Sequence, residues 1–380
     1  MRKHRTIDCI ALLSALDILG VMALRSRRRA NCGTIVLLAL AVLSADARAV
    51  TIDTVPVGNP GNAADSTGFG SVAYDYRIGT YEVTNAQYAE FLNAKAASDP
   101  LALYSPSMGS NDRGGITQSG VSGSFSYATR ADMANKPVNY ISFYDAIRFA
   151  NWLHNGQGSG DTETGAYTLA DGRSVTRNAG ATWFVPTENE WYKAAYYDPR
   201  SAAQGGPPGD AHYWLYPTAS NSVPNQATAN AVGDISNPGV NVANYNDGAD
   251  WNGQIGNVTT VGSAGPLSAS HYGTYDQGGN VWEYNEASSF FGIYREEGGS
   301  GFSGIPLYLQ ASGWATVPAD PQGGYDSLGF RVARVPEPAS LTLLALGLPL
   351  IVWRKLRRSV RGGVPIGLRI TLTTTTQAAK

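Results

Sequence analysis

Three short segments of the chain each join a strand-like run to the start of an amphipathic helix. In each one a Ser or Thr precedes Gln, Asp or Glu by three residues, which is the capping-box pattern of a helix N-terminus. The pairs are Thr84 with Gln87, Ser142 with Asp145, and Thr187 with Glu190. Behind each cap, apolar residues recur on one helical face. These residues are Tyr88, Phe91 and Leu92, then Ile147, Ala150, Trp152 and Leu153, then Trp191, Ala194 and Ala195. The pattern predicts three helices, preceded by strands in YRIGTYEV, PVNYI and TWFV, and gives these residues a structural role.

Between these helices the chain consists mostly of Gly, Asn, Ser and aromatic residues, and residues 200–275 are especially poor in regular pattern. A loop-dominated stretch of this length inside a compact domain needs to be tied down, and a bound metal would do so without disulfides. The last clear element, LGFRVARV, alternates like a strand and is expected to close the domain. Residues 50–70 are expected to be a linker. The whole body, 50–334, suits one large domain or two small ones.

The first 49 residues are interpreted as a leader. Residues 25–49 contain a basic region, an apolar region from Ile35 to Leu43, and a small-x-small exit directly before residue 50. This order is typical of a secretory signal peptide and predicts export. It lies unusually far from the first residue, so Met22 is an alternative start. A double membrane anchor is the alternative interpretation.

A second apolar segment lies near the C-terminus. Residues 335–358 contain a Pro-Glu-Pro triplet, fifteen uncharged residues from Ala339 to Trp353, and a basic cluster. The apolar run is short for a bilayer span of about 20 residues, and the basic cluster is expected to stay in the cytoplasm. These parts, in this order, resemble the PEP-CTERM sorting signal of exopolysaccharide-producing Gram-negative bacteria. The tail, 359–380, departs from that pattern, which ends near the arginines.

This second resemblance implies a route out of the cell. It implies a short transmembrane helix, recognition by an exosortase-type protease, and anchoring in the inner membrane until sorting. Release to the cell surface or the extracellular matrix would follow. A plain C-terminal anchor is the alternative.

The charge and the cysteine content of residues 50–334 limit the classes of partner and of chemistry that this part of the chain can have. Residues 50–334 contain 13 Lys and Arg against 26 Asp and Glu, a net charge of −13. An acidic body without a basic stripe argues against nucleic acid as a partner and is compatible with divalent cations. Both cysteines, Cys9 and Cys32, lie in the leader. The body therefore has neither disulfides nor thiol chemistry, although export would take it where disulfides form.

Six motifs carry a family resemblance. They are IGTYEVTNAQYAEFL, PVNYISFYDAIRFANWL, FVPTENEWYKAA, YDQGGNVWEY, GGS and LGFRVAR, in that order. Together, over roughly residues 71–334, they resemble the formylglycine-generating (sulfatase-modifying factor) superfamily. The resemblance implies a compact, loop-rich α+β domain related to the C-type lectin fold, with bound structural calcium.

The resemblance also suggests calcium ligands. In DQGGNVWE it implies a side-chain oxygen from Asp276, carbonyls from Gly279 and Val281, and a carboxylate from Glu283. Two carboxylates around a glycine pair suit a hard cation that takes six to eight oxygen ligands. A Gly-Gly turn with solvated acids is the alternative.

A second calcium site in such domains uses an Asn, the next carbonyl and a downstream Asp. Asn244 and Tyr245 match the first two ligands. Asp250 is taken for the third, although its spacing departs from the family's pattern.

The GGS motif bears on the family's catalysis. Members that oxidise a substrate cysteine to formylglycine use two cysteines shortly after GGS, and these bind copper as thiolates. Laid on this chain, the motif places Ser303 and Tyr308 at the two cysteine positions. Neither residue can replace a soft thiolate at Cu(I), so copper is not expected.

Other enzyme classes find little support. The iron-dependent branch of the superfamily needs a histidine-rich site, whereas His154, His212 and His271 are isolated in this sequence. No G-x-S-x-G frame marks a serine nucleophile. Glu188 and Glu190 lie two apart at a helix start, so they point in different directions and do not form a glycosidase pair.

The sequence therefore favours an exported, calcium-stabilised binding module of the cell envelope or exopolysaccharide matrix, without catalytic residues. Its 21 Tyr and 8 Trp suit sugar faces and protein interfaces. A groove bordered by Trp251, Trp282 and Trp314 is one expectation, with core packing the alternative for Trp282. The ligand would be a polysaccharide or a matrix protein. The competing functions are an oxidoreductase of the superfamily with an unrecognised metal site and a purely structural surface protein.

Overall fold

The computed structural model describes residues 49–209, 211–289, 294–319 and 324–336. The leader and the C-terminal segment and tail lie outside these residues, so the expectations about export and sorting stay predictions. The chain divides into two units, Met1–Val50 and Thr51–Lys380, and the fold below is that of the second. Within the four described ranges, no helix is both long and apolar enough to cross a bilayer.

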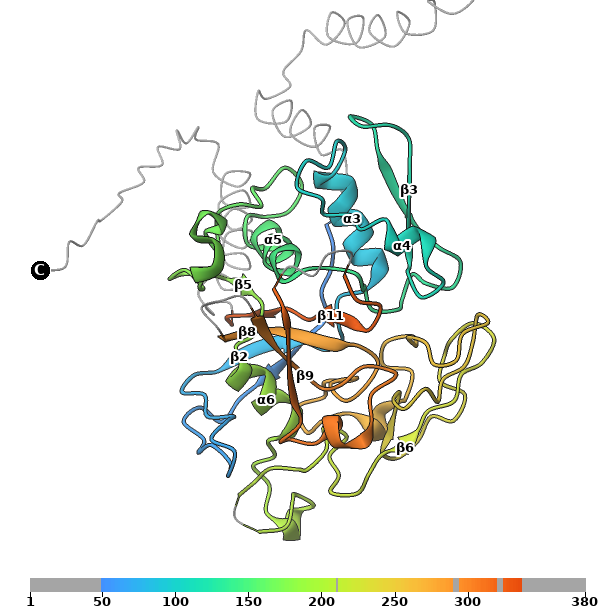
Figure 1. The fold of residues 1–380 in the computed structure, drawn as a ribbon. Helices are drawn as coiled ribbons and strands as arrows, with labels where there is room; N and C mark the ends of the chain where they lie inside the picture. The colour runs from blue at the N-terminus through green and yellow to red at the C-terminus, as the bar shows by residue number, and fades with distance from the viewer. Residues whose placement is uncertain (1–48, 210, 290–293, 320–323, 337–380) are drawn as a thin grey trace, which may run out of the picture. The chain divides into compact units, whose positions relative to one another are not determined.

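Helices are few and mostly short. Three carry most of the helical structure: α3 (Asn85–Lys95), α5 (Phe143–His154) and α6 (Glu188–Tyr196). The shorter turns are α4 (Ser107–Ser110), η1 (Leu169–Ser174), η2 (Ala202–Gln204), η3 (Pro266–Ser268) and η5 (Pro306–Leu309). Figure 1 shows α3 and α5 next to each other, with α6 on the other side of the strands.

The strands form two four-stranded sheets and two small pairs. The first sheet has the order β1 (Thr54–Val57), β2 (Tyr76–Gly79), β12 (Ala333–Arg334) and β5 (Trp183–Phe184), all antiparallel. The second has the order β10 (Trp314–Pro318), β9 (Tyr294–Gly298), β8 (Trp282–Ser289) and β11 (Leu328–Phe330), with β11 parallel to β8. The pairs are β3 (Ile116–Ser119) with β4 (Ser126–Thr129), and β6 (Asn225–Gln226) with β7 (Val242–Ala243).

All three expected capping boxes are present. At α3 the Gln87 amide donates to Thr84 Oγ1 at 3.3 Å, and the Thr84 amide donates back to Gln87 Oε1 at 2.9 Å. The same reciprocal pair forms at Ser142 and Asp145, and at Thr187 and Glu190. These bonds satisfy amides that have no partner inside the helix. The apolar positions expected behind each cap are buried, so the three-helix prediction is confirmed.

One expected strand is missing. PVNYI forms only an isolated bridge, between Pro137 and Thr84. Pro137 has no amide to donate, and Tyr140 has a φ of 59°, which ends an extended run. All five residues of PVNYI are buried, so their strand-like composition reflects burial and not a place in a sheet.

The final strand is divided between the two sheets. LGFRVARV was expected to form a single strand, but β11 lies in one sheet and β12 in the other. Arg331, between them, is fully buried and turns its side chain to β8. The segment 50–70, expected to be a linker, contains β1, which pairs with β2. It is therefore part of the domain.

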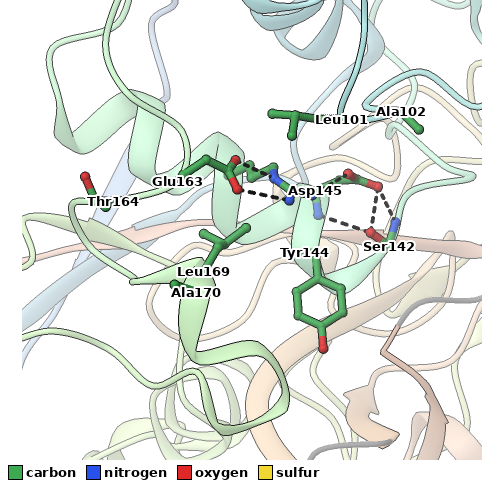
Figure 2. A pocket seen from close by; sticks show the side chains of 10 residues that line it. Leu101, Ala102, Ser142, Tyr144, Asp145, Glu163, Thr164, Leu169 and Ala170 are labelled. Atoms are coloured by element: carbon green, nitrogen blue, oxygen red, sulfur yellow. Dashed lines mark hydrogen bonds and ion pairs between the residues drawn. The ribbon is translucent and has the colours of Figure 1, made fainter.

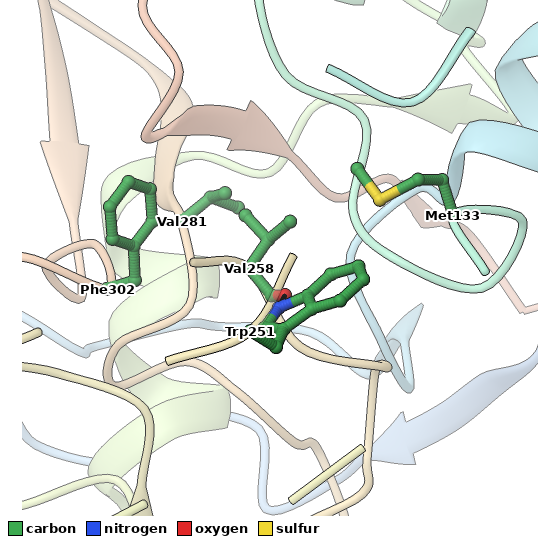
Figure 3. Packing of buried hydrophobic residues seen from close by; sticks show 5 residues of the cluster. All are labelled: Met133, Trp251, Val258, Val281 and Phe302. Carbon is green, nitrogen blue, oxygen red and sulfur yellow. Dashed lines mark hydrogen bonds between the residues drawn. The ribbon is translucent and has the colours of Figure 1, made fainter. Parts of the chain in front are cut away.

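Protein contacts hold the loop-rich stretch of residues 200–275. Trp251 and Val258 pack against Met133, Val281 and Phe302 in one buried cluster (Figure 3). The Trp251 indole donates to the Val258 carbonyl at 2.8 Å. Trp251 is therefore a core residue and does not border an open groove, contrary to the expectation for the three tryptophans.

Candidate functional site

The described part of the fold holds a buried ion pair at its centre. Glu283 lies on β8 and Arg331 follows β11, and both side chains are fully buried. Arg331 Nε donates to Glu283 Oε2 at 2.5 Å, and Nη2 donates to Oε1 at 2.6 Å. The Trp191 indole of α6 adds a bond to Oε2 at 2.8 Å. Arg331 also donates to the carbonyls of Gly79 and Tyr275, each at 2.9 Å. The guanidinium and carboxylate thus join both sheets and α6.

This arrangement does not suit Glu283 as a calcium ligand. Its carboxylate accepts three hydrogen bonds, two of them from a cation, and Arg331 would repel a divalent ion placed beside it. Glu283 would have to give up one of these bonds to join a calcium shell with Asp276, Gly279 and Val281, and that four-residue shell stays a prediction.

Asp276 has different neighbours. Its Oδ2 accepts from the Gly262 amide at 2.6 Å, and its φ is 59°. Burial raises the pKa of its carboxyl to about 6.

A further buried acid, Glu82, lies near Asp276 and was not anticipated from the sequence. Asn280 Nδ2 donates to Glu82 Oε1 at 3.0 Å. Oε2 is buried and has no hydrogen-bond partner among the described residues. Burial raises the pKa of Glu82 well above its usual range, and the nearby Asp276 and Glu283 carboxylates add to the effect. The signal in the sequence was a lone Glu between Tyr81 and Val83, two residues before the Thr84 cap.

The two predicted calcium segments lie side by side. The Asn280 amide donates to the Asn244 carbonyl at 2.7 Å. A Cβ on Gly279 would lie 2.1 Å from that same oxygen, and the φ of Gly279 is 98°, so this position requires glycine. The sequence placed these segments in two separate sites, and the fold brings them into contact.

Asn244 suits a cation ligand better than Glu283 does. Its Nδ2 donates to the Asn257 carbonyl at 2.8 Å, and its Oδ1 is buried without a partner among the described residues. The Tyr245 carbonyl accepts from the Gly248 amide at 3.2 Å. Asp250 is exposed and accepts from the Gly256 amide at 2.8 Å, within its own turn. Asn244 and Tyr245 are neighbours in the chain, and the side-chain hydrogen bonds of Asp250 and Asn244 go to different partners.

The GGS segment is held by backbone hydrogen bonds. The Gly279 amide donates to the Gly299 carbonyl at 2.7 Å, and the Phe302 amide donates to the Asn280 carbonyl at 2.8 Å. Ser300 is fully buried with a φ of 69°. These two bonds therefore fix the GGS segment against Gly279 and Asn280 of DQGGNVWE.

Beyond Phe302, the segment from 303 to 308 reaches solvent, and we call it the GGS loop face. Ser303 is exposed, and Ile305 and Leu307 are 48% and 56% exposed. Tyr308, in η5, is 39% exposed, and its ring lies edge-on to Trp282 with centroids 5.5 Å apart. The positions matched to the family's cysteines are thus accessible, and they carry a hydroxyl and a phenol.

His154 lies in a network of its own, whereas His212 and His271 both contact the Asp198–Arg200 pair. His154 Nδ1 is 2.8 Å from Thr182 Oγ1, and His271 Nδ1 is 3.1 Å from Asp198 Oδ1. Burial lowers the pKa of His271. His212 Nδ1 lies 3.3 Å from a backbone carbonyl. Over the described ranges, no three or more His, Cys, Asp or Glu side chains gather as a metal cluster.

A model of a known family matches most of the domain described above. The sulfatase-modifying factor enzyme 1-like domain matches residues 62–336. The chain belongs to this family, and its fold is the loop-rich α+β fold expected from the sequence.

Solved structures are similar to this chain at low identity. The crystal structure of CarF is 19% identical, with a TM-score of 0.48, and the match covers 76% of this chain and 100% of that chain. Treponema denticola variable protein 1 is 16% identical, with a TM-score of 0.41, covering 76% and 97%. PvdO from Pseudomonas aeruginosa is 16% identical, with a TM-score of 0.38, covering 76% and 93%. No curated protein matches the sequence.

Proposed function

We propose that this chain is an exported binding module that uses the sulfatase-modifying factor fold without the family's oxidation chemistry. The observation that carries the proposal is the pair Ser303 and Tyr308 at the positions matched to the catalytic cysteines. Residues 50–334 contain no cysteine that could take over. A hydroxyl and a phenol are hard oxygen groups and do not bind Cu(I) as thiolates do.

The GGS loop face is the proposed contact surface. Ile305, Leu307 and Tyr308 present apolar and aromatic groups to solvent beside Trp282, while the backbone behind them is fixed by hydrogen bonds. Aromatic side chains with one polar end suit sugar faces and protein interfaces. The proposed ligand is an extracellular polysaccharide or a matrix protein, and an exosortase-type protease would act on the C-terminal segment.

The test is a pull-down of the full-length protein with exopolysaccharide and matrix protein from the producing cells. We expect Tyr308→Ala to reduce retention about tenfold or more, because aromatic side chains dominate such contacts. The matched control is Val240→Ser, which removes another exposed apolar side chain, 66% exposed, far along the sequence. Equal retention of both variants would exclude the GGS loop face.

The same preparation tests the oxidase alternative. Metal analysis of the purified protein should find neither copper nor iron, and a cysteine-containing peptide should stay unoxidised with added Cu(I) and oxygen. Stoichiometric copper or iron with peptide oxidation would replace the binding proposal with an oxidoreductase.

We also propose that calcium stabilises the domain at Asn244, whose Oδ1 supports this role. A cation that binds only the folded state raises the melting temperature. Millimolar calcium should therefore raise Tm relative to EDTA, and Asn244→Ala should remove that calcium-dependent increment. The increment should persist in Asp250→Ala, because Asp250 is exposed and bonded within its own turn. An unchanged Tm in calcium would contradict the proposal.

A further inference from the structure

A cavity of about 630 Å³ lies beside the start of α5. Three stretches distant in sequence line it: residues 101–102, the first turns of α5, and residues 163–170. None of its lining residues belongs to the GGS loop face or to the predicted calcium segments. Its volume falls within the range of about 300–1,000 Å³ typical of small-molecule sites.

The walls of this cavity combine apolar surface with a row of charged groups. Figure 2 shows Leu101 on one side of the row from Glu163 to Asp145, and Leu169 and the Tyr144 ring on the opposite side. Tyr144 is only partly buried, so part of its surface is accessible.

The charges in the row partly neutralise one another: one arginine lies between two carboxylates, which leaves a net charge of −1. Arg148 Nε donates to Glu163 Oε1 at 2.8 Å, and Nη2 donates to Oε2 at 3.2 Å. Asp145 Oδ2 accepts from the Ser142 amide and hydroxyl, at 2.9 and 2.7 Å. Arg148 therefore holds its planar group fixed between two carboxylates. A free anion would have to displace Glu163 to reach Arg148, and a free cation would be repelled by the positive charge of Arg148.

Hydrogen-bonding capacity remains on this fixed row. Arg148 Nη1 lies 3.8 Å from Asp145 Oδ1, beyond hydrogen-bond distance, so its N–H groups can donate to a ligand. Glu163 Oε1 already accepts from Arg148 Nε and Thr162 Oγ1, whereas Oε2 accepts from Arg148 Nη2 and keeps a lone pair for a ligand. Donors and acceptors side by side match vicinal hydroxyl groups, each of which both donates and accepts.

We propose that this cavity binds a neutral oligosaccharide. Vicinal hydroxyls of a pyranose contact Arg148 and Glu163, and the apolar face of the sugar packs on the Tyr144 ring, with Leu101 and Leu169 as apolar walls. This inference is independent of the proposed function, because it concerns a different surface.

The test is calorimetric titration of the full-length protein with maltotriose, cellotriose and mannotriose. We expect saturable binding of at least one, with Tyr144→Ala weakening it about tenfold. Arg148→Lys keeps the charge but loses the planar fork, and it should weaken binding similarly. Tyr144→Phe should bind nearly as the unmodified protein does. Equal melting temperatures check that each variant is folded.

Several results would overturn the proposal. They are no binding of any neutral trisaccharide, equal binding by Tyr144→Ala, or tighter binding of trigalacturonate or of the cationic glucosamine trimer. Tyr308→Ala separates the two proposals, since it should leave trisaccharide binding unchanged while reducing matrix retention. Trisaccharide binding lost in Tyr308→Ala and kept in Tyr144→Ala would place the sugar on the GGS loop face.

Discussion

The buried ion pair and the GGS loop face differ in what their residues do for the molecule. Glu283 and Arg331 have no exposed surface, and the bonds they make join two sheets and a helix. Ser303 and Tyr308, about twenty residues along the chain from Glu283, face solvent at the end of the same GGS segment. Motifs such as NVWEY and LGFRVAR therefore identify the fold because they hold it together. The short segment matched to the family's cysteines is exposed at its end and is held by backbone hydrogen bonds at its start.

The largest expected effect is at the ion pair. Arg331→Met leaves the Glu283 carboxylate buried without its cation, which should lower the free energy of unfolding by about 3–5 kcal/mol. Urea denaturation of the full-length protein measures the change. The double variant Glu283→Leu with Arg331→Met should recover most of the loss, because no uncompensated charge remains. A loss below about 1 kcal/mol in the single variant would show that the pair is not central.

A smaller effect on stability, dependent on pH, is expected from Lys193, which lies on α6 two residues after Trp191. Burial lowers the pKa of Lys193 to about 8. Below pH 8 the lysine is charged in both the folded and unfolded states, so the folded protein bears the full desolvation penalty. Between pH 8 and about 10.5 the folded state loses this proton first, and stability rises with pH.

Replacement of Lys193 isolates this contribution. Lys193→Met should be more stable than the unmodified protein at pH 7, and its advantage should shrink by on the order of 1–2 kcal/mol by pH 9.5. Denaturation at several pH values measures the gap. A gap that stays constant from pH 7 to 9.5 would contradict the lowered pKa.

The start of the same helix offers a third comparison. Thr187→Ala removes the hydroxyl that accepts from the Glu190 amide at 3.1 Å. The loss of such a cap should lower stability by about 1 kcal/mol. Thr187→Ser keeps the hydroxyl and is the control, with an expected change of only a few tenths of a kcal/mol. Equal losses in the two variants would assign the effect to packing of the methyl group.

The smallest effect is expected at the loop. Ser303→Ala should change the free energy of unfolding by less than about 0.5 kcal/mol, because the side chain is exposed. The comparison position is Ser300, three residues earlier, which is buried. Ser300→Val should lower the free energy of unfolding by more than about 1 kcal/mol, because the larger side chain would be overpacked against Gly304. Similar losses at both positions would remove the contrast between the fixed and exposed parts of the segment.

Local patterns allowed much of the fold to be predicted from the sequence. The caps at Thr84, Ser142 and Thr187 depend on residues three apart, and such spacing survives in any tertiary context. The change of sheet at Arg331 could not be read from LGFRVARV, because period-two alternation records burial and not the partner strand.

The candidate site was less predictable, because its parts come from distant segments. Glu283 was interpreted as a metal ligand, since nothing local shows that Arg331 lies against it. The surroundings of the buried Glu82 depend on Asn280, 198 residues away, which donates to its Oε1. The cavity at α5 likewise needs Glu163 and Leu101 to meet the first turns of a helix that the sequence located correctly.

The placement of β12 has a mechanical consequence. It is the last strand before the C-terminal segment, yet it lies inside its sheet, bonded to β2 on one side and β5 on the other. Tension applied to the chain from its C-terminal end passes the Val335–Thr182 bond and then reaches β12, where it is divided between two neighbours. An edge strand in the same position would be bonded to one neighbour only, and its hydrogen bonds would break one after another under tension. A domain pulled from this end would therefore yield abruptly and at higher force.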